Sequence, residues 1–145
     1  MLIEKDELPL VTMNFMNETH NEDREIINEI FELILHYEKN PSQNNTENIN
    51  VSYQKWFNHT VEHFNVEEEK MRELNFPPYT FHKGEHDKAL ELMHEVFSEW
   101  KESENIFILK RYFIEDLPLW LTQHIQSMDM VTAEFFATGK SPCSG

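Results

Sequence analysis

The stretch His59-Thr-Val-Glu-His63-Phe-Asn-Val-Glu67-Glu-Glu-Lys-Met71 decides how this chain is interpreted. His63 and Glu67 stand four residues apart, so on a helix both side chains lie on one face, one turn apart. An imidazole and a carboxylate displayed in this way can bind one metal ion or bridge to a second one. The stretch therefore predicts a metal site on a helix.

Composition narrows the class of protein. The chain has 145 residues, of which 39% are hydrophobic, and this is enough apolar material for one domain with a packed core. Only 3 glycines argue against an all-β fold with many tight turns. The formal net charge of −15 argues against nucleic acids and anionic membranes as partners, because like charges repel.

No targeting segment is expected. No apolar run approaches the ~20 residues that a membrane-spanning helix needs. The first residues, Met-Leu-Ile-Glu-Lys-Asp-Glu, lack the basic and then apolar order of a signal peptide. The single cysteine, Cys143, cannot form an internal disulfide, so a reducing cytoplasm is the expected location.

Apolar residues at helical spacing predict four helical segments, at about 14–40, 49–74, 78–102 and 105–138. An irregular arm, residues 1–13, is expected before them, a polar loop at 40–48, and a loose tail at 139–145. Four amphipathic helices with short connections predict an all-α fold, an antiparallel up-and-down four-helix bundle in a single domain.

Several boundaries stay open. The first helix begins between Asn14 and Thr19, where Thr19 and Glu22 have capping-box spacing and Asn14 and Asn17 are rival caps. In the last segment, Asp116 is a candidate N-cap with Pro118 just inside, and the alternative is one long helix kinked at the proline. The inward stripe of the second helix is expected to be Trp56, Thr60, His63, Glu67, Met71 and Leu74.

Each predicted helix offers at least one inward metal ligand. The candidates are His20, His63, Glu67, His82, His86, His124 and Asp129. Five residues on a straight helix turn by roughly 140°, so His124 and Asp129 should approach the centre from its two sides, which suits two metal ions. Five imidazoles and two carboxylates carry less negative charge than the four carboxylates of carboxylate-rich di-iron bundles, which favours Fe(II) and dioxygen binding.

Other patterns have simpler interpretations. His82-Lys-Gly-Glu85-His86 matches the inverted zinc-protease motif, with Glu85 as a general base, but that role leaves the remaining histidines unexplained. We expect three histidines outside the ligand set, His36, His59 and His94, to lie at the surface. Glu68 and Glu69 are also expected to face solvent.

The full set of motifs resembles hemerythrin, and most closely the bacterial single-domain hemerythrins. The resemblance runs from about Thr19 to Asp129. It rests on His63-Phe64-x-x-Glu67-Glu68-x-x-Met71, His82-x-x-x-His86 and Trp120-x-x-x-His124-Ile125-x-x-x-Asp129. All seven ligand positions match in type and order.

The resemblance implies a non-heme di-iron centre. One iron would be bound by His82, His86 and His124, the other by His20 and His63, with Glu67, Asp129 and an oxo or hydroxo group bridging them. Dioxygen would bind the two-histidine iron, in a pocket walled by Phe64, Trp120, Leu121 and Ile125.

Two features depart from the family pattern. The arm contains no tryptophan, and Asp23 stands three residues after His20, where an apolar residue is common. Asp23 has two interpretations: it faces water in the first turn of a helix that starts late, or it points toward the open coordination position and forms part of the dioxygen pocket.

The function implied is reversible dioxygen binding for storage, delivery or scavenging. One alternative is a sensor of O2, NO or redox state that acts through a separate protein partner. Another is a di-iron peroxidase or an enzyme that handles nitric oxide. A monomer or a small homo-oligomer is expected.

Overall fold

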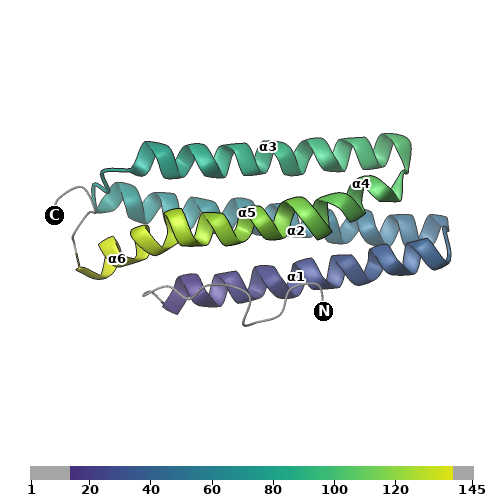
Figure 1. The fold of residues 1–145 in the computed structure, drawn as a ribbon, viewed down its shortest axis with the longest axis horizontal. Helices are drawn as coiled ribbons and strands as arrows, with labels where there is room; N and C mark the ends of the chain where they lie inside the picture. The colour runs from purple at the N-terminus through teal and green to yellow at the C-terminus, as the bar shows by residue number, and fades with distance from the viewer. Residues whose placement is uncertain (1–13, 139–145) are drawn as a thin grey trace.

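The computed structural model describes residues 14–138, so the expected arm, the tail and Cys143 lie outside the described residues. Three long helices are α1 (Asn14–Lys39), α2 (Gln43–Glu73) and α3 (Tyr79–Ser103). A fourth rod runs over residues 106–138 and is made of several consecutive helical pieces. The four rods lie side by side, and successive rods run in opposite directions (Figure 1). The predicted antiparallel four-helix bundle is confirmed.

The start of α1 decides where Asp23 lies. The helix already includes Asn14, so Thr19 lies inside it and the predicted capping box with Glu22 is wrong. Asp23 is therefore well beyond the first turn. The buried stripe of α1 starts at Met16, passes through Asp23 and continues through Ile27, Ile30 and Ile34.

The polar loop expected at 40–48 is mostly helix. Ser42 has an extended backbone, and its Oγ accepts a hydrogen bond from the Asn45 N–H at 3.1 Å, so α2 begins at Gln43 instead of Ile49. The Asn45 side chain also donates to the Asn40 carbonyl at 2.8 Å. Polar residues suggested a loop here, but most of them are exposed on a capped helix, and Thr46 is buried.

The inward stripe of α2 is one residue shorter than predicted. Leu74 follows the last residue of the helix and is 43% exposed, so it does not belong to the core. Asn75 has a φ of 53°, the left-handed conformation that commonly ends a helix. The buried stripe therefore ends at Met71.

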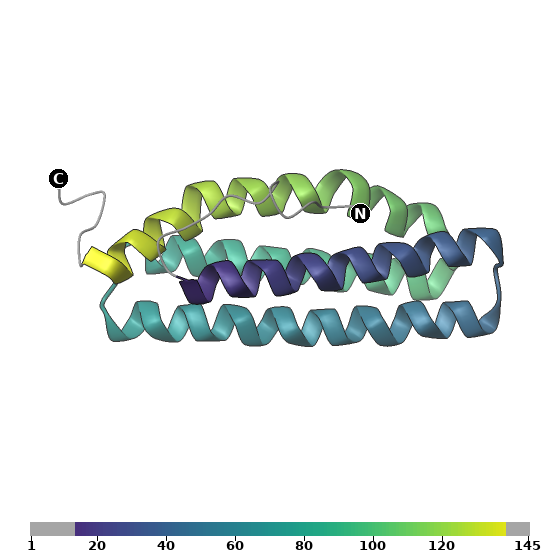
Figure 2. The same ribbon diagram turned by 90° about the horizontal axis from the view of Figure 1, so that it is seen from below.

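The fourth rod is continuous through Pro118. It consists of α4 (Ile106–Arg111), the π-helical turn η2 (Tyr112–Asp116), α5 (Leu117–His124), the π-helical turn η3 (Ile125–Asp129) and α6 (Met130–Thr138). Asp116 has right-handed helical angles and no side-chain cap, so the predicted N-cap is wrong. The wider η2 turn, closed by the Leu117 N–H on the Tyr112 carbonyl, comes just before the proline ring. Figure 2 shows the rod curving gently instead of breaking.

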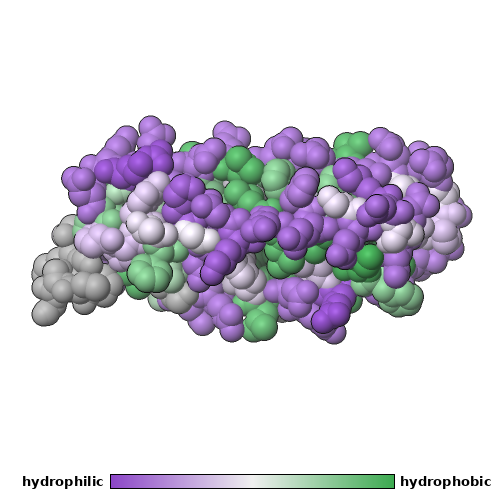
Figure 3. Space-filling model, turned by 90° about the horizontal axis from the view of Figure 1, so that it is seen from above, coloured by the Kyte–Doolittle hydropathy of each residue, from purple (hydrophilic) through white to green (hydrophobic). Residues whose placement is uncertain are grey.

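The largest core cluster fills the bundle around aromatic rings. Tyr53 stacks on Phe97 at 4.3 Å between ring centroids, and its hydroxyl donates to the Met93 carbonyl at 2.7 Å. Trp100 is fully buried and meets Tyr37 edge to face. The face of the molecule seen in Figure 3 is mostly hydrophilic, with scattered apolar side chains, as the net charge of −15 leads one to expect. Within residues 14–138, no helix has the length and apolar character to cross a membrane.

Candidate metal centre

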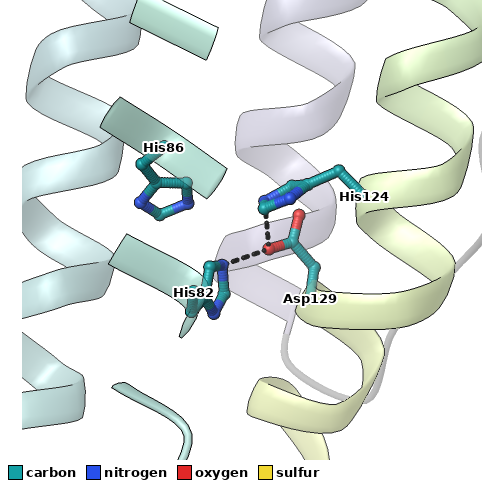
Figure 4. A group of neighbouring side chains, drawn as sticks. All are labelled: His82, His86, His124 and Asp129. Atoms are coloured by element: carbon teal, nitrogen blue, oxygen red, sulfur yellow. Dashed lines mark ion pairs between the residues drawn. The ribbon is translucent and has the colours of Figure 1, made fainter. Parts of the chain in front are cut away.

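Four of the predicted ligands form one buried group. One ligand atom from each of His82, His86, His124 and Asp129 lies within 4.8 Å of all the others. Helix α3 supplies the first two, which point toward the fourth rod, where His124 ends α5 and Asp129 ends η3 (Figure 4). All four side chains are buried.

The π-helical turn η3 explains why His124 and Asp129 meet. Their side chains were expected to approach the centre from two sides, but His124 Nε2 lies 3.1 Å from Asp129 Oδ1. The turn is closed by the Met130 N–H on the Ile125 carbonyl, five residues back, so it holds one residue more than an α-helical turn. The extra residue brings positions five apart onto one face. The two-sided expectation is therefore wrong.

Three further predicted ligands form a second group. Ligand atoms of His20 from α1 and of His63 and Glu67 from α2 also lie within 4.8 Å of one another. His63 Nε2 is 3.5 Å from Glu67 Oε1, as the four-residue spacing on one helix predicts. The two groups together contain all seven predicted ligand residues.

Asp129 links the two groups. Its Oδ2 lies 2.9 Å from His20 Nε2, which belongs to the second group. Its Oδ1 lies 3.0 Å from His82 Nε2 in its own group. One carboxylate thus presents an oxygen to each side, which is the arrangement that a bridging ligand requires.

Glu67 links the groups in the same way. Its Oε1 faces His63, and its Oε2 lies 3.3 Å from His86 Nε2 in the first group. Burial and the nearby Asp129 raise the pKa of Glu67, but His63 and His86 outweigh them, and the pKa lies below its ordinary value. Burial likewise raises the pKa of Asp129, but His124 and the other histidines hold it well below the ordinary value. Both carboxylates are therefore in the charged form that binds metal ions.

The inward-facing atoms of the cluster lack hydrogen-bond partners. Within residues 14–138, these buried atoms without an aligned partner include Nε2 of His63, His82, His86 and His124, both carboxylate oxygens of Glu67, and Oδ1 of Asp129. Buried polar groups are nearly always hydrogen-bonded, so such a converging set needs an explanation. Metal ions between the two groups would use these lone pairs, and the residues present fit that role.

The outer nitrogens of three histidines are held in place. His82 Nδ1–H donates to Thr132 Oγ1 at 2.7 Å, and the threonine hydroxyl itself donates to the Met128 carbonyl. His86 and His63 make the corresponding contacts through Nδ1 to carboxylates. Such outer hydrogen bonds fix the tautomer that leaves Nε2 free for a metal ion.

Glu68 is one of these carboxylates, and its predicted solvent exposure is wrong. The side chain is only 5% exposed, and Oε2 accepts from His86 Nδ1 at 3.0 Å. Lys83 Nζ lies 3.7 Å from the other oxygen and is partly exposed. Glu69, the next residue, is exposed as expected.

Asp23 is the other carboxylate. It is 6% exposed, and Oδ2 accepts from His63 Nδ1 at 3.1 Å, so the interpretation that it faces water is wrong. Its Oδ1 lies 3.1 Å from Nε2 of His59, which is half-buried and not at the surface as predicted. Burial raises the pKa of Asp23, but the contacts with His59 and His63 outweigh it and hold the pKa below its ordinary value. His36 and His94 are exposed, as predicted.

A cavity of about 230 Å³ adjoins one side of the cluster. It touches both histidines of the second group, His20 and His63, and it also touches His124 and Asp129 of the first group, but neither His82 nor His86. The pocket residues predicted from the sequence that line it are Phe64, Trp120, Leu121 and Asp23. Ile125 is fully buried in the core and does not line it.

Two aromatic rings shield the ligands. Phe64 stacks on His86 with 3.8 Å between ring centroids, and Trp120 stacks on His124 at 4.6 Å.

Three residues that contact the site were not predicted from the sequence: Glu68, His59 and Thr132. A signal existed for Glu68, because it lies four residues after Phe64 on a helix that meets two neighbours, whereas nothing marked Thr132.

The fold and this cluster define a helical-bundle protein with a buried, two-part site of histidines and shared carboxylates suited to metal ions. Two known proteins are similar to the chain. A bacteriohemerythrin from Aquifex aeolicus is 28% identical over 134 residues, covering 92% of this chain and 97% of that protein. A bacteriohemerythrin from Ralstonia nicotianae is 34% identical over 79 residues, covering 54% of this chain and 56% of that protein.

These matches support the assignment of the chain to the bacterial hemerythrin family, which its motifs predicted. No protein-family model matches the chain. No solved structure matches it either.

Proposed function

We propose that the cluster holds two iron ions and that the protein binds dioxygen reversibly, for storage, delivery or scavenging. The observation that supports this most directly is that Glu67 and Asp129 each face histidines of both groups. In this proposal His82, His86 and His124 hold one ion, His20 and His63 hold the other, and the two carboxylates are shared. A pair of iron ions supplies the redox chemistry of dioxygen binding when bound.

The chain's own residues would orient the site and keep it dry. The outer contacts of Thr132, Glu68 and Asp23 hold three imidazoles with Nε2 inward. Phe64 and Trp120 cover ligand rings and limit the access of water. The cavity meets both histidines of the two-histidine position but only one of the other three, His124, which is covered by Trp120. Dioxygen would therefore arrive at the two-histidine position.

An aerobic absorption spectrum with iron analysis and an oxygen-removal cycle tests this function. We expect about two irons per chain and near-ultraviolet bands of a bridged diferric centre. The oxygenated spectrum should disappear when oxygen is removed and return when it is restored. Protein that holds one zinc ion and shows no such bands after iron reconstitution would contradict the proposal. Turnover of peroxide or nitric oxide would favour the enzyme, and redox-dependent binding of a purified partner would favour the sensor.

Replacing Glu68 with alanine should weaken metal binding. The change leaves the buried His86 Nδ1–H without its acceptor, and loss of such outer partners typically costs about 10- to 100-fold in metal affinity. Iron competition with a chelator measures the effect. Glu69→Ala is the matched control, because Glu69 is the adjacent glutamate and is exposed. Equal affinity in the two variants would contradict the role assigned to Glu68.

Deleting Gln126 should leave the site intact. Gln126 is exposed and lies in η3, so its removal converts the π-helical turn into an α-helical one and leaves the histidine and aspartate four apart, still on one face. We expect about two irons per chain and unchanged helix content by circular dichroism. Deletion of exposed Asn65, between His63 and Glu67 in the regular helix α2, is the comparison and should abolish iron binding. Iron loss in the Gln126 deletion would show that η3 does not act as a one-residue insertion.

A further inference from the structure

The cavity beside the cluster is larger than dioxygen needs. Its volume is about 230 Å³, whereas one water molecule, similar in size to dioxygen, takes up about 30 Å³ of the liquid. Protein interiors are close-packed and hold few voids larger than a water molecule. An apolar cavity of about 150 Å³ is enough to bind benzene. The cavity reaches the proposed metal ligands His20, His63, His124 and Asp129, so the metal ions and dioxygen would take part of this volume. The remaining volume, on the side away from these ligands, matches a small organic molecule.

The walls suit an aromatic ligand. Four aromatic side chains from α2 and the fourth rod line the cavity: Trp56, Phe64, Tyr112 and Trp120. Aliphatic side chains complete the walls, namely Ile27, Leu92, Met93, Leu117 and Leu121. Aromatic rings favour stacked and edge-to-face contacts with one another, which adds to the gain from burying apolar surface.

Tyr112 gives this apolar space a polar group. The residue is 4% exposed, and burial followed by the nearby charge of Asp116 raises the pKa of its hydroxyl, so it stays protonated. Within residues 14–138, this hydroxyl makes no hydrogen bond to another protein group. A ligand with one hydroxyl or carbonyl oxygen would accept a hydrogen bond from it.

The outer lining of the cavity favours uncharged ligands. Glu85 is half-buried, and Lys88 and Asp116 are exposed, so these three residues mark where the cavity reaches solvent. Two negative charges and one positive charge leave an excess of negative charge there, which disfavours carboxylates. A cation would have to give up its hydration to enter walls that are mostly apolar, which costs free energy.

We propose that this cavity binds a small uncharged aromatic molecule that carries one hydrogen-bonding group, a ligand class distinct from dioxygen. The ring lies among the four aromatic side chains, and the polar group accepts from Tyr112. Because the same cavity touches His20 and His63, the bound molecule and dioxygen exclude each other. This inference goes beyond the proposed function and is independent of which gas the metal site binds.

Two fluorinated probes test the proposal on the iron-loaded protein. Fluorobenzene and 4-fluorobenzyl alcohol are titrated by ¹⁹F NMR and calorimetry, and both should bind saturably. Tyr112→Phe should lower the affinity for the alcohol by about threefold to tenfold, the usual contribution of one hydrogen bond, and leave the affinity for fluorobenzene unchanged. No saturable binding of either probe, or an alcohol affinity that ignores Tyr112→Phe, would overturn the proposal.

A filled cavity provides the matched control. Ala89 lines the cavity on α3, whereas Ala137 is exposed on α6 and lies outside the lining. Ala89→Phe should weaken both probes at least tenfold, and Ala137→Phe should change neither. Leu92→Trp is the second filling variant, and it is tolerated more readily because Leu92 is 42% exposed. Unchanged affinity in a folded, filled variant would show that the probes bind elsewhere.

The two proposals fail separately. Iron content and the oxygenated spectrum are measured on the same samples as the probe affinities. Protein that loads iron and binds dioxygen but neither probe overturns the aromatic site alone. Protein that binds the probes but does not load iron overturns the proposed function alone.

Discussion

Replacing Glu67 with alanine is expected to lower the iron content from about two per chain to one or none and to abolish dioxygen binding. Glu67 is completely buried, and its two oxygens face His63 on one side and His86 on the other. The change therefore removes the one anion of α2 that both metal positions share. It also leaves a cavity and two imidazoles that repel each other when protonated.

The measurement is iron per chain after anaerobic reconstitution, followed by the absorption spectrum in air. Glu69→Ala is the control on the same helix, since Glu69 is exposed and, within residues 14–138, makes no contact with the ligands. Glu67→Gln separates charge from shape, because it keeps the volume and loses the anion. If Glu67→Ala still bound two irons and dioxygen, the carboxylate would not be a shared ligand and the two groups would have to be assigned anew.

The helices and the ligand positions were predictable because both depend on regular spacing. His63 and Glu67, like His82 and His86, stand one α-helical turn apart, so a straight helix already places each pair on one face. The assumption of regular α-helical spacing gave the wrong relative direction for the side chains of His124 and Asp129. The π-helical turn between them changes the rotation per residue, and no residue type in 125–129 marks such a turn.

Glu68 and Asp23 show why burial was harder to predict than helicity. Each helix of a four-helix bundle packs against two neighbours, so its buried face is wider than a single stripe. On α2, His63 and Glu67 point to the metal cluster at the centre of the bundle, while Phe64 and Glu68 contact His86 of α3. The acidic run 67–69 therefore contains two buried carboxylates instead of the one predicted, because Glu68 finds its partner, His86, on another helix.

The largest effect outside the ligands is expected at Asp23. In Asp23→Leu, the His63 Nδ1–H loses its acceptor and His59 loses the nearer of its carboxylate partners, in a place where Asp23 is only 6% exposed. We expect iron binding at the His20–His63 position to weaken by about 10- to 100-fold, while the three-histidine position keeps its iron. Asp23→Asn keeps a hydrogen-bond acceptor without the charge, so its iron affinity should lie between those of the unchanged protein and Asp23→Leu.

Chelator competition measures the weakening, and the decay of the oxygenated spectrum at several pH values adds a second readout. Asp23 also lines the cavity, so it has a second route of action, directly on a molecule bound there. His59→Gln separates the two routes. It disturbs the outer contact of Asp23 but lies outside the cavity lining. If Asp23 acts by holding His63, His59→Gln should lower the iron affinity as Asp23→Leu does, but by a smaller factor. If Asp23→Leu retains both irons and only slows the decay, the carboxylate acts on the bound oxygen through the cavity, and the role in orienting His63 is wrong.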